Sequence, residues 1–282
     1  MRLQILGLSR FSYPSNLEAF QKDHADADGQ RAYLYDETRL EGRFYFFEEL
    51  VIPSIKRQRD TGFRLVVLAG DQMPPKWRAR LEAAVADVPQ VDLRFEPEGQ
   101  NHSDLCRRLM LEARDKSADW VAEFRLDDDD AVAGDFVERL RKLAPAVAAL
   151  ADASPEKRAA LDFAKGFVLR AQRSGLDISP VLARLWTPAL VMVNRPDHPK
   201  SLLDTRHLRL WQRFPVISNV DEPMFIRGAH DDNDSAVENR KLQKFRIDPF
   251  DIPAKIEERF GLDLDRLETR WRLCPARKKL GC

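Results

Sequence analysis

The chain has 282 residues, of which 44% are hydrophobic and 33% are charged, so it is long enough for one α/β domain with a sizeable core. Its 46 Lys and Arg residues balance its 46 Asp and Glu residues, and this zero net charge argues against a general nucleic-acid binder. The three cysteines are odd in number and widely spaced, which predicts a protein without disulfides. The sequence has no stretch of about 18 to 20 apolar residues, so we expect no transmembrane segment and a cytoplasmic protein.

The first half of the chain alternates short apolar runs with amphipathic segments. Strands are predicted over residues 4–8, 63–69, 91–95 and 120–126, and helices over 43–59, 74–85 and 103–114. This alternation favours an α/β fold with a mostly parallel central sheet and helices on both faces. In such sheets, ligands bind beyond the carboxyl ends of the strands.

The second half is less regular. We expect a helix over 136–150, a polar break over 151–158, strands over 163–169 and 189–193 separated by residues 174–188, a helix over 202–213, and one or two helices over 253–272. No internal repeat, low-complexity linker or domain boundary is visible in the sequence. We therefore expect a single domain that ends in a helical extension.

Four adjacent aspartates, Asp127 to Asp130, follow the strand predicted over 120–126 without a spacer. Their carboxylates repel one another unless a cation or hydrogen-bond donors compensate the charge. One interpretation is a solvated turn in which an aspartate caps the next helix. The position at a strand end favours a site for Mn²⁺ or Mg²⁺, which one or two carboxylates and substrate phosphates commonly hold. Asp127 with Asp129 and Asp128 with Asp130 are equally spaced pairs, and we predict that the first pair binds the metal.

Residues 126–130 resemble the D-x-D motif of GT-A glycosyltransferases, which follows the fourth strand of their nucleotide-binding half. Residues 7–13 (GLSRFSY), 124–130 (FRLDDDD) and 223–230 (PMFIRGAH) are similar to a family of bacterial rhamnosyltransferases, and the resemblance spans most of the chain. It implies a GT-A fold and a UDP-, GDP- or dTDP-sugar donor. The corresponding parts of the chain would be a nucleotide-binding half (1–130), an acceptor half (131–250) and a C-terminal helical tail (251–282).

The resemblance also implies roles for individual residues. Asp127 would meet the ribose or the metal, and Asp129 would bind the metal directly. His230, which lies in a dense polar cluster, would be a further metal ligand, and His102 is its competitor because it precedes a helix near the nucleotide edge. The metal would stabilise negative charge on the departing nucleotide.

Three further positions are candidates for binding the nucleotide. Arg10 follows the first strand, where a guanidinium can clamp a phosphate with two hydrogen bonds. Asp71 follows the second strand and either accepts a hydrogen bond from the nucleotide base or serves as a turn residue. Arg107 and Arg108 lie on the helix before the motif strand, where one of them would face the phosphate. We predict that this residue is Arg107.

A reaction that inverts the anomeric centre needs a general base to take the proton of the acceptor hydroxyl. The acidic residues late in the chain are candidates, and Asp221 and Asp232 are the predictions among them; Glu222 and Asp231 are the alternatives. A retaining reaction needs no such base, and the sequence leaves the stereochemistry open.

Two other features have both a functional and a structural interpretation. Trp186, Trp211, Phe214 and Phe225 would either stack on an acceptor sugar or pack in the core. The basic segment 270–279 would either contact an anionic membrane that carries a lipid-linked acceptor or form a solvated helix end.

The sequence therefore favours a metal-dependent glycosyltransferase that moves a sugar, with rhamnose suggested by the family's name, to a hydroxyl of a bacterial glycan. Two alternatives remain. A metal-dependent phosphotransferase or hydrolase also holds Mg²⁺ at strand-end aspartates, but Ala131 does not fit the pattern D-x-D-x-[TV] of the aspartate-nucleophile type. The other alternative is a Ca²⁺- or carbohydrate-binding domain without catalysis.

Overall fold

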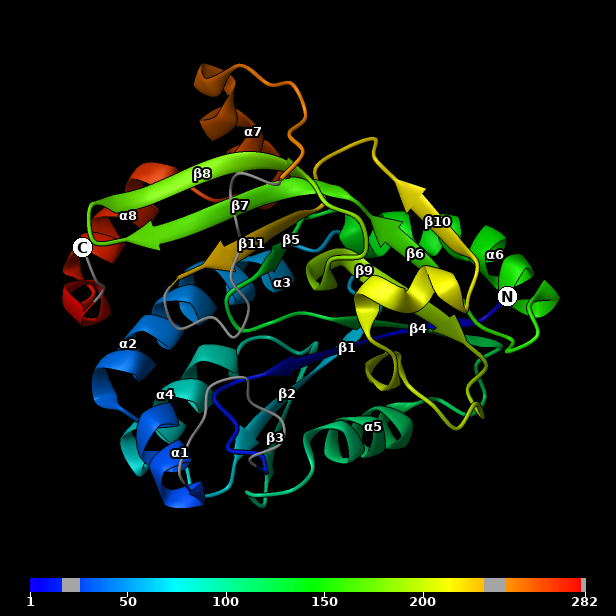
Figure 1. The fold of residues 1–282 in the computed structure, drawn as a ribbon, viewed down its shortest axis with the longest axis horizontal. Coiled ribbons are helices and arrows are strands. Elements are labelled where there is room, and N and C mark those ends of the chain that lie inside the picture. Colours follow the sequence, from blue (N-terminus) through cyan, green and yellow to red (C-terminus); the bar gives the residue numbers. More distant parts are fainter. Residues whose placement is uncertain (17–25, 231–241, 280–282) are drawn as a thin grey trace.

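The computed structural model describes residues 1–16, 26–230 and 242–279, and within them two sheets form the frame of the protein (Figure 1). The first sheet contains β1 (Leu3–Arg10), β2 (Arg64–Gly70), β3 (Val91–Glu96), β4 (Trp120–Arg125), β6 (Ala159–Phe163), β9 (Leu190–Asn194) and β10 (Val216–Asn219). The second contains β5 (Ala131–Val132), β7 (Lys165–Gln172), β8 (Gly175–Leu182) and β11 (Phe225–Ala229). The larger helical elements are α1 (Ala27–Leu34), α2 (Glu37–Phe46), the π-helix η2 (Phe47–Val51), α3 (Ile52–Lys56), α4 (Pro75–Val85), α5 (His102–Ala113), α6 (Phe136–Ala153), α7 (Ile252–Phe260) and α8 (Leu264–Leu273).

The first sheet is mostly parallel. Its strand order is β10-β6-β9-β4-β1-β2-β3, and β9 runs opposite to both of its neighbours while the other pairings are parallel. The second sheet has the order β5-β11-β7-β8 and begins directly after the acidic run. The carboxyl ends of β1 and β4 therefore lie side by side at the edge where the two sheets meet.

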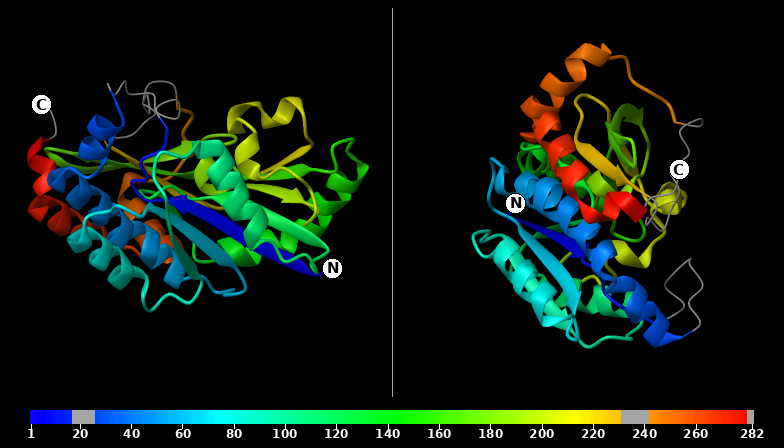
Figure 2. Two further views of the ribbon diagram at one scale, coloured as in Figure 1. Left: turned by 90° about the horizontal axis from the view of Figure 1, so that it is seen from below. Right: turned by 90° about the vertical axis from the view of Figure 1, so that its left-hand side faces the viewer.

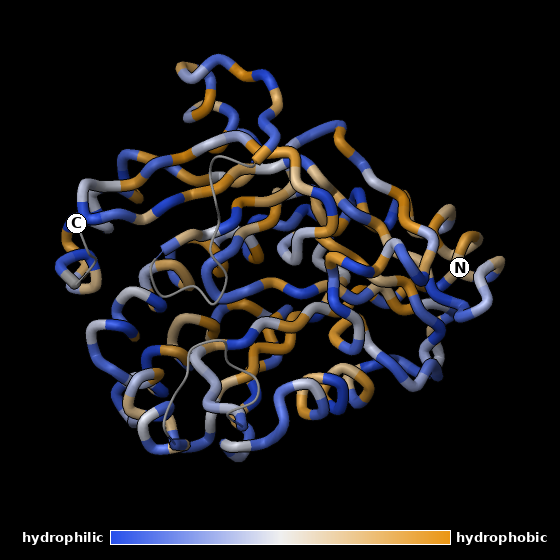
Figure 3. Tube along the Cα trace, viewed as in Figure 1, coloured by the Kyte–Doolittle hydropathy of each residue, from blue (hydrophilic) through white to orange (hydrophobic). Residues whose placement is uncertain are grey.

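Alternating side chains explain why helices cover both faces of the first sheet. Leu6 and Leu8 of β1 pack with apolar residues of α5, whereas Ile5 belongs to the larger core that includes α2, η2 and α6. Because successive strand residues point to opposite faces, one apolar strand supplies both cores. Figure 3 shows apolar residues gathered along the strands at the centre of the molecule.

The C-terminal helices pack against the helical layer formed by α2 and η2 (Figure 2). Tyr45 donates a hydrogen bond of 2.9 Å from its hydroxyl to the carbonyl of Leu267, and Trp271 donates one of 2.8 Å from Nε1 to the carbonyl of Gln172. Among the described residues, no helix has the length and apolar character needed to cross a membrane.

The predicted fold class, a GT-A-like α/β fold with a mostly parallel sheet and a C-terminal helical extension, is confirmed. The order of strands and helices before the acidic run is also as predicted, although the first long helix begins at Glu37 and contains a π-helical segment. Two helices, α7 and α8, form the predicted extension.

Several predictions for the second half are wrong in detail. The single strand expected over 163–169 is two strands, because the chain leaves the first sheet at Ala164 and enters the second as β7. The interval 174–188 contains β8, an edge strand in which Pro180 is tolerated because, among the described residues, the outer side of the strand is paired only at Leu182, with Gln243. The helix expected over 202–213 is two short 3₁₀ helices, η4 (Leu202–Asp204) and η5 (His207–Gln212).

Candidate functional site

The four aspartates form a tight turn between β4 and β5. The amide of Asp130 donates to the carbonyl of Asp127 over 3.2 Å, and Leu126 is held by a 3.0 Å hydrogen bond to the carbonyl of Leu8 on β1. Asp128, Asp129 and Asp130 are buried, and Asp127 is partly exposed. This burial excludes the interpretation of the run as an ordinary solvated turn, since buried carboxylates need compensating charge or donors.

Strand β11 fixes the turn from behind. The amide of Gly228 donates to Asp130 Oδ1 over 3.1 Å. A Cβ atom at position 228 would collide with the backbone carbonyl oxygen of Asp129, so only glycine allows this approach of the two backbones. The same strand leads to His230, which is thereby placed beside the turn.

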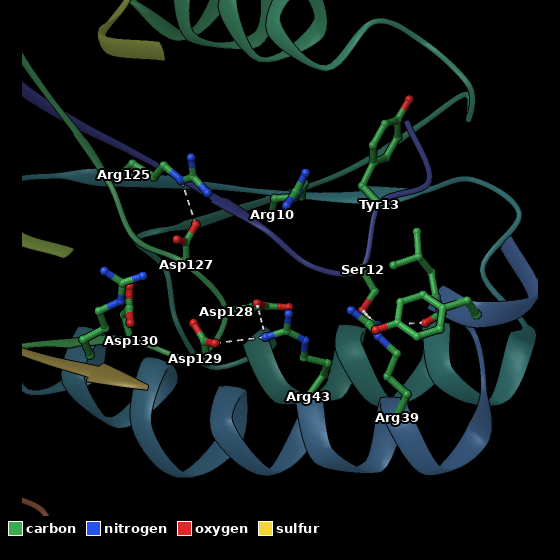
Figure 4. A pocket seen from close by; sticks show the side chains of 13 residues that line it. Arg10, Ser12, Tyr13, Arg39, Arg43, Arg125, Asp127, Asp128, Asp129 and Asp130 are labelled. Atoms are coloured by element: carbon green, nitrogen blue, oxygen red, sulfur yellow. Dashed lines mark hydrogen bonds and ion pairs between the residues drawn. The ribbon is translucent and has the colours of Figure 1, made fainter. Parts of the chain in front are cut away.

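Arg43 of α2 reaches into the turn (Figure 4). Its Nη1 lies 3.1 Å from Asp128 Oδ1, 3.1 Å from Asp129 Oδ2 and 3.1 Å from Nε2 of His230. His230 Nε2 is also 3.0 Å from Asp129 Oδ2, and its ring stacks on Phe46 with centroids 4.9 Å apart. Two carboxylates and an imidazole thus converge on one positively charged nitrogen.

A pocket opens in front of the turn, with about 700 Å³ of empty space including its open mouth. Its polar walls combine the four aspartates with five arginines: Arg10, Arg39, Arg43, Arg125 and Arg227. The mixture of both charges, at the carboxyl ends of parallel strands, is suited to a ligand that carries phosphate groups.

Each arginine comes from a different part of the wall. Arg125, the last residue of β4, pairs with Asp127 over 2.7 Å. Arg39 lies one helical turn before Arg43 and donates to the hydroxyl of Ser12 over 3.0 Å. Ser12 has a left-handed backbone with φ of 45°, so the chain bends sharply after β1. Arg227 of β11 lies over the ring of Trp186, 4.6 Å from its centroid.

Two carboxyl groups of the turn have raised pKa values despite these arginines. Burial raises the pKa of Asp128 to about 6, against the opposing effect of Arg43. Burial also raises the pKa of Asp130 well above its usual value, and the neighbouring charges of Asp129 and Asp127 raise it further. The site therefore holds more negative charge than its surroundings stabilise, which is favourable for taking up a cation.

The structure brings together part of the predicted set. Arg10, Asp127 and Asp129 all line the pocket, and His230 contacts Asp129. The predicted pair Asp127 and Asp129 does not share one partner, because Asp127 pairs with Arg125 whereas Asp129 pairs with Arg43.

His102 has a different environment from His230. It contacts Cys106, with 3.5 Å between Nδ1 and Sγ. Burial lowers its pKa to about 3, and the charges of Arg10 and Arg125 act in the same direction. His230 is the better candidate, because its ring contacts a carboxylate of the turn, Asp129, whereas the ring of His102 contacts the thiol of Cys106.

Asp71, Arg107 and Asp221 lie outside the pocket walls. Asp71 is exposed, and Arg107 pairs with Asp104 and with Asp204, the latter over 2.7 Å. Asp221 is exposed and accepts from the side chain of Asn219 over 2.8 Å. Asp232 lies outside the described residues.

The aromatic group predicted to bind an acceptor is divided. Phe214 and Phe225 are buried in the core, Trp186 supports Arg227, and Trp211 is exposed on η5. Sequence reasoning missed Arg39, Arg43, Arg125 and Arg227. A usable signal was the spacing of Arg39 and Arg43, four residues apart on a helix, which places both on one face.

The described residues do not form a ready metal site, since no group of three or more His, Cys, Asp or Glu side chains among them has a suitable arrangement. The reason is visible at Arg43, whose nitrogen lies between the carboxylates and the imidazole. The residues nevertheless fit a cation that takes few ligands from the protein and completes its shell with phosphates, as Mg²⁺ commonly does.

Comparison with known proteins gives one family match. The sequence pattern of the family described as "Putative rhamnosyl transferase" matches residues 4–242. No curated protein matches the chain.

Solved structures with a similar arrangement include Staphylococcus aureus TarS 1-349 in complex with UDP, with a TM-score of 0.42, 11% identity, and coverage of 80% of this chain and 60% of that chain. TarS 1-349 in complex with UDP-GlcNAc has a TM-score of 0.39 and 11% identity, and covers 99% of this chain and 74% of that chain. A "putative nucleotide-diphospho-sugar transferase" from Desulfovibrio desulfuricans G20 has a TM-score of 0.33 and 11% identity, with 80% of each chain covered.

Proposed function

We propose that this chain moves a sugar from a nucleoside diphosphate donor to a hydroxyl of a bacterial glycan or lipid-linked acceptor. The chain belongs to the putative rhamnosyl transferase family and is a glycosyltransferase. Rhamnose is the proposed sugar, as the family's description suggests. UDP, GDP and dTDP are the candidate nucleotides, and the first two structures named above contain UDP and UDP-GlcNAc.

The observation that carries this proposal is the pocket with five arginines and four aspartates. A diphosphate bears charges that arginines recognise with paired hydrogen bonds. When the bond to the sugar breaks, negative charge develops on the departing diphosphate. Arg10, Arg39, Arg125 and Arg227 line the wall from several sides and would stabilise that charge without reorganisation.

A divalent cation, Mn²⁺ or Mg²⁺, is the second part of the proposal. Asp129 would hold it together with a neighbouring carboxylate of the turn, Asp127 or Asp128, and with His230. When bound, it supplies Lewis-acid stabilisation of the diphosphate. The support is the raised pKa of Asp128, caused mainly by burial, and the convergence of Asp128, Asp129 and His230 on the nitrogen of Arg43.

The acceptor side is less defined by the described residues. Asp221 and Asp232 remain the proposed candidates for a general base, the first being exposed and the second outside the described residues. We place the reaction in the cytoplasm as part of the same proposal, because Cys106 and Cys274 are free thiols, as expected in a reducing compartment.

The test measures binding of UDP, GDP and dTDP by calorimetry, each with Mn²⁺ and with chelator, in the wild type, Asp129→Ala and Asp71→Ala. We expect one nucleotide to bind at least tenfold more tightly with Mn²⁺, and this gain to be lost in Asp129→Ala, since a charge-assisted contact is worth roughly 1.5–3 kcal/mol. Asp71→Ala, an exposed aspartate outside the pocket walls, is the matched control.

The outcomes separate the two parts of the proposal. Metal-dependent binding that is unchanged in a correctly folded Asp129→Ala protein would overturn the metal assignment. No binding of any of the three nucleotides to the wild type would overturn the donor class. Release of free nucleotide from dTDP-rhamnose, compared with UDP-glucose, then tests the identity of the sugar.

A further inference from the structure

The helix η5 presents an unusual surface (the yellow helix near the label of β9 in Figure 1). In a 3₁₀ helix, side chains three residues apart lie in one row along the axis. Leu208 and Trp211 therefore form one row, and they are 57% and 60% exposed. Arg206, at the N-cap, and Arg209 form the adjacent row.

The third row of η5 anchors the helix to the body of the protein. Leu210 is fully buried, and Phe214, just beyond the helix, packs in the same core cluster. His207 donates from Nδ1 to the carbonyl of Leu185 over 2.6 Å. Because one face is fixed in this way, the exposed leucine and tryptophan are held outward on a rigid support.

The two rows on the surface complement a single kind of partner. Within the described ranges, neither Arg206 nor Arg209 forms an ion pair. An apolar row of Trp and Leu beside a row of uncompensated Arg is the composition of segments that lie in the headgroup region of anionic membranes. Trp in particular favours this boundary, where its ring is partly in apolar surroundings and its N–H remains hydrated.

The basic C-terminal segment, in contrast, is occupied within the protein. Arg270 pairs with Glu49 over 3.0 Å, Arg272 pairs with Glu268 over 2.7 Å, and Arg277 donates to the carbonyl of Arg173 over 2.8 Å. Membrane contact predicted there from the sequence thus has weaker support than contact at η5.

The position of η5 relates it to the pocket. Burial lowers the pKa of His207, and the charges of Arg125 and Arg227 act on it in the same direction. These two arginines line the pocket, so the inner face of η5 is within electrostatic reach of the proposed donor site.

We propose that the row of Leu208 and Trp211, flanked by Arg206 and Arg209, docks the protein on an anionic lipid surface. Leu208 and Trp211 enter the headgroup boundary, and the two arginines face the acidic lipids. The further step, that the membrane presents a lipid-linked acceptor there, rests on the proposed glycosyltransferase function.

The experiment is co-sedimentation of the full chain with vesicles of phosphatidylcholine containing 30% phosphatidylglycerol, or of phosphatidylcholine alone. The wild type is expected to bind the anionic vesicles and to bind neutral vesicles much more weakly. The double variants Arg206→Gln/Arg209→Gln and Leu208→Ser/Trp211→Ser should each bind the anionic vesicles at least about tenfold more weakly than the wild type. The first variant loses two basic groups near the lipid surface, and the second loses two apolar side chains.

Matched controls are available in the same chain. Phe250→Ser removes an aromatic residue that is 93% exposed elsewhere, and Arg277→Gln/Lys278→Gln removes two charges from the C-terminal segment. Both should bind vesicles like the wild type. Circular dichroism of all variants checks that they are folded, and Trp211→Phe should abolish most of the quenching of tryptophan fluorescence by brominated lipids.

The proposal is overturned if the wild type does not sediment with anionic vesicles, or if folded η5 variants bind as well as the controls do. Equal loss of binding in the controls would also overturn it, because the contact would then be a general charge effect. Since no donor is present in these assays, their outcome is independent of the nucleotide-binding test. A soluble glycan that changes the fluorescence of Trp211, in a protein that does not bind vesicles, would assign the surface to an acceptor sugar instead.

Discussion

Strand β4 carries two acidic regions with opposite properties. Glu123, in the middle of the strand, is fully buried and accepts four hydrogen bonds: 2.8 and 2.7 Å from Arg114, 3.0 Å from the side chain of Asn194 and 2.8 Å from the amide of Leu202. The aspartate turn, four residues further on, shares the single nitrogen of Arg43 between Asp128 and Asp129. Asp128 and Asp129 thus share one cationic nitrogen, whereas each oxygen of Glu123 accepts hydrogen bonds from two donor atoms.

This difference indicates which acidic group is structural and which is functional. Arg114 also donates to the carbonyls of His198 and Lys200, so the Glu123 network fastens the segment that leads to η4 and η5. A fully satisfied buried group specifies the fold. Burial raises the pKa of Asp128 and Asp130, and it raises the pKa of Glu123 as well, so the two regions differ in their hydrogen-bond partners and in the pocket beside the turn.

The largest effect is expected at the complete network. Glu123→Ala leaves the guanidinium of Arg114 buried without its partner, so the free energy of unfolding should fall by roughly 3–5 kcal/mol, measured by urea denaturation. Glu48→Ala, which breaks a half-exposed pair with Arg80, is the control and should cost about 1 kcal/mol or less. A loss below about 1 kcal/mol in Glu123→Ala would show that the network is not structural.

An intermediate effect is expected at Arg43. Arg43→Ala removes the shared cation from two buried carboxylates, so the unfolding free energy in chelator should fall by about 1–3 kcal/mol. Mn²⁺ should restore much of it, because the cation then compensates the same carboxylates. Thermal unfolding with and without Mn²⁺ measures this. The comparison fails if Mn²⁺ stabilises Arg43→Ala no more than it stabilises Arg80→Ala, which alters an arginine outside the pocket walls.

The smallest effect concerns pH. Burial raises the pKa of Asp128 from 3.8 to about 6 in the folded state, so the folded protein takes up a proton before the unfolded chain does as the pH falls. Stability associated with this group is therefore lost as the pH rises through 6. Asp128→Asn should be more stable than the wild type at pH 7 to 8, and the difference should shrink towards pH 4. Urea denaturation across that range tests this, and a difference that is constant or grows on acidification contradicts it.

The sequence was sufficient for the first sheet and for the location of the site. Apolar runs such as 63–69 lie in strands covered on both faces, so composition alone identifies them. The second sheet was harder because β8 alternates polar residues and contains Pro180, as an edge strand can. The split at Ala164 was not predicted, because apolar residues dominate on both sides of it, although Asp162 and Lys165 interrupt them.

Within the site, residues next to the motif were predictable and residues brought in by tertiary packing were not. Asp127 and Asp129 lie on the turn itself, and His230 was found through resemblance to a family. Arg43 comes from 86 positions earlier in the chain, so its place beside Asp129 depends on how α2 packs on the sheet. The pairing of Arg107 with Asp204 was not predictable either, because the two residues are 97 positions apart.

The nitrogen of Arg43 acts as a tethered counter-ion for the acidic turn. Because it is attached to α2, its effective concentration at the carboxylates does not fall when the solution is diluted or desalted. A sodium or potassium ion carries the same charge and gains little by exchange with it, whereas a divalent ion with two phosphates attached gains more. If a metal binds as proposed, its measured affinity is the free energy of this exchange, and the site should discriminate by ionic charge before it discriminates by ion size.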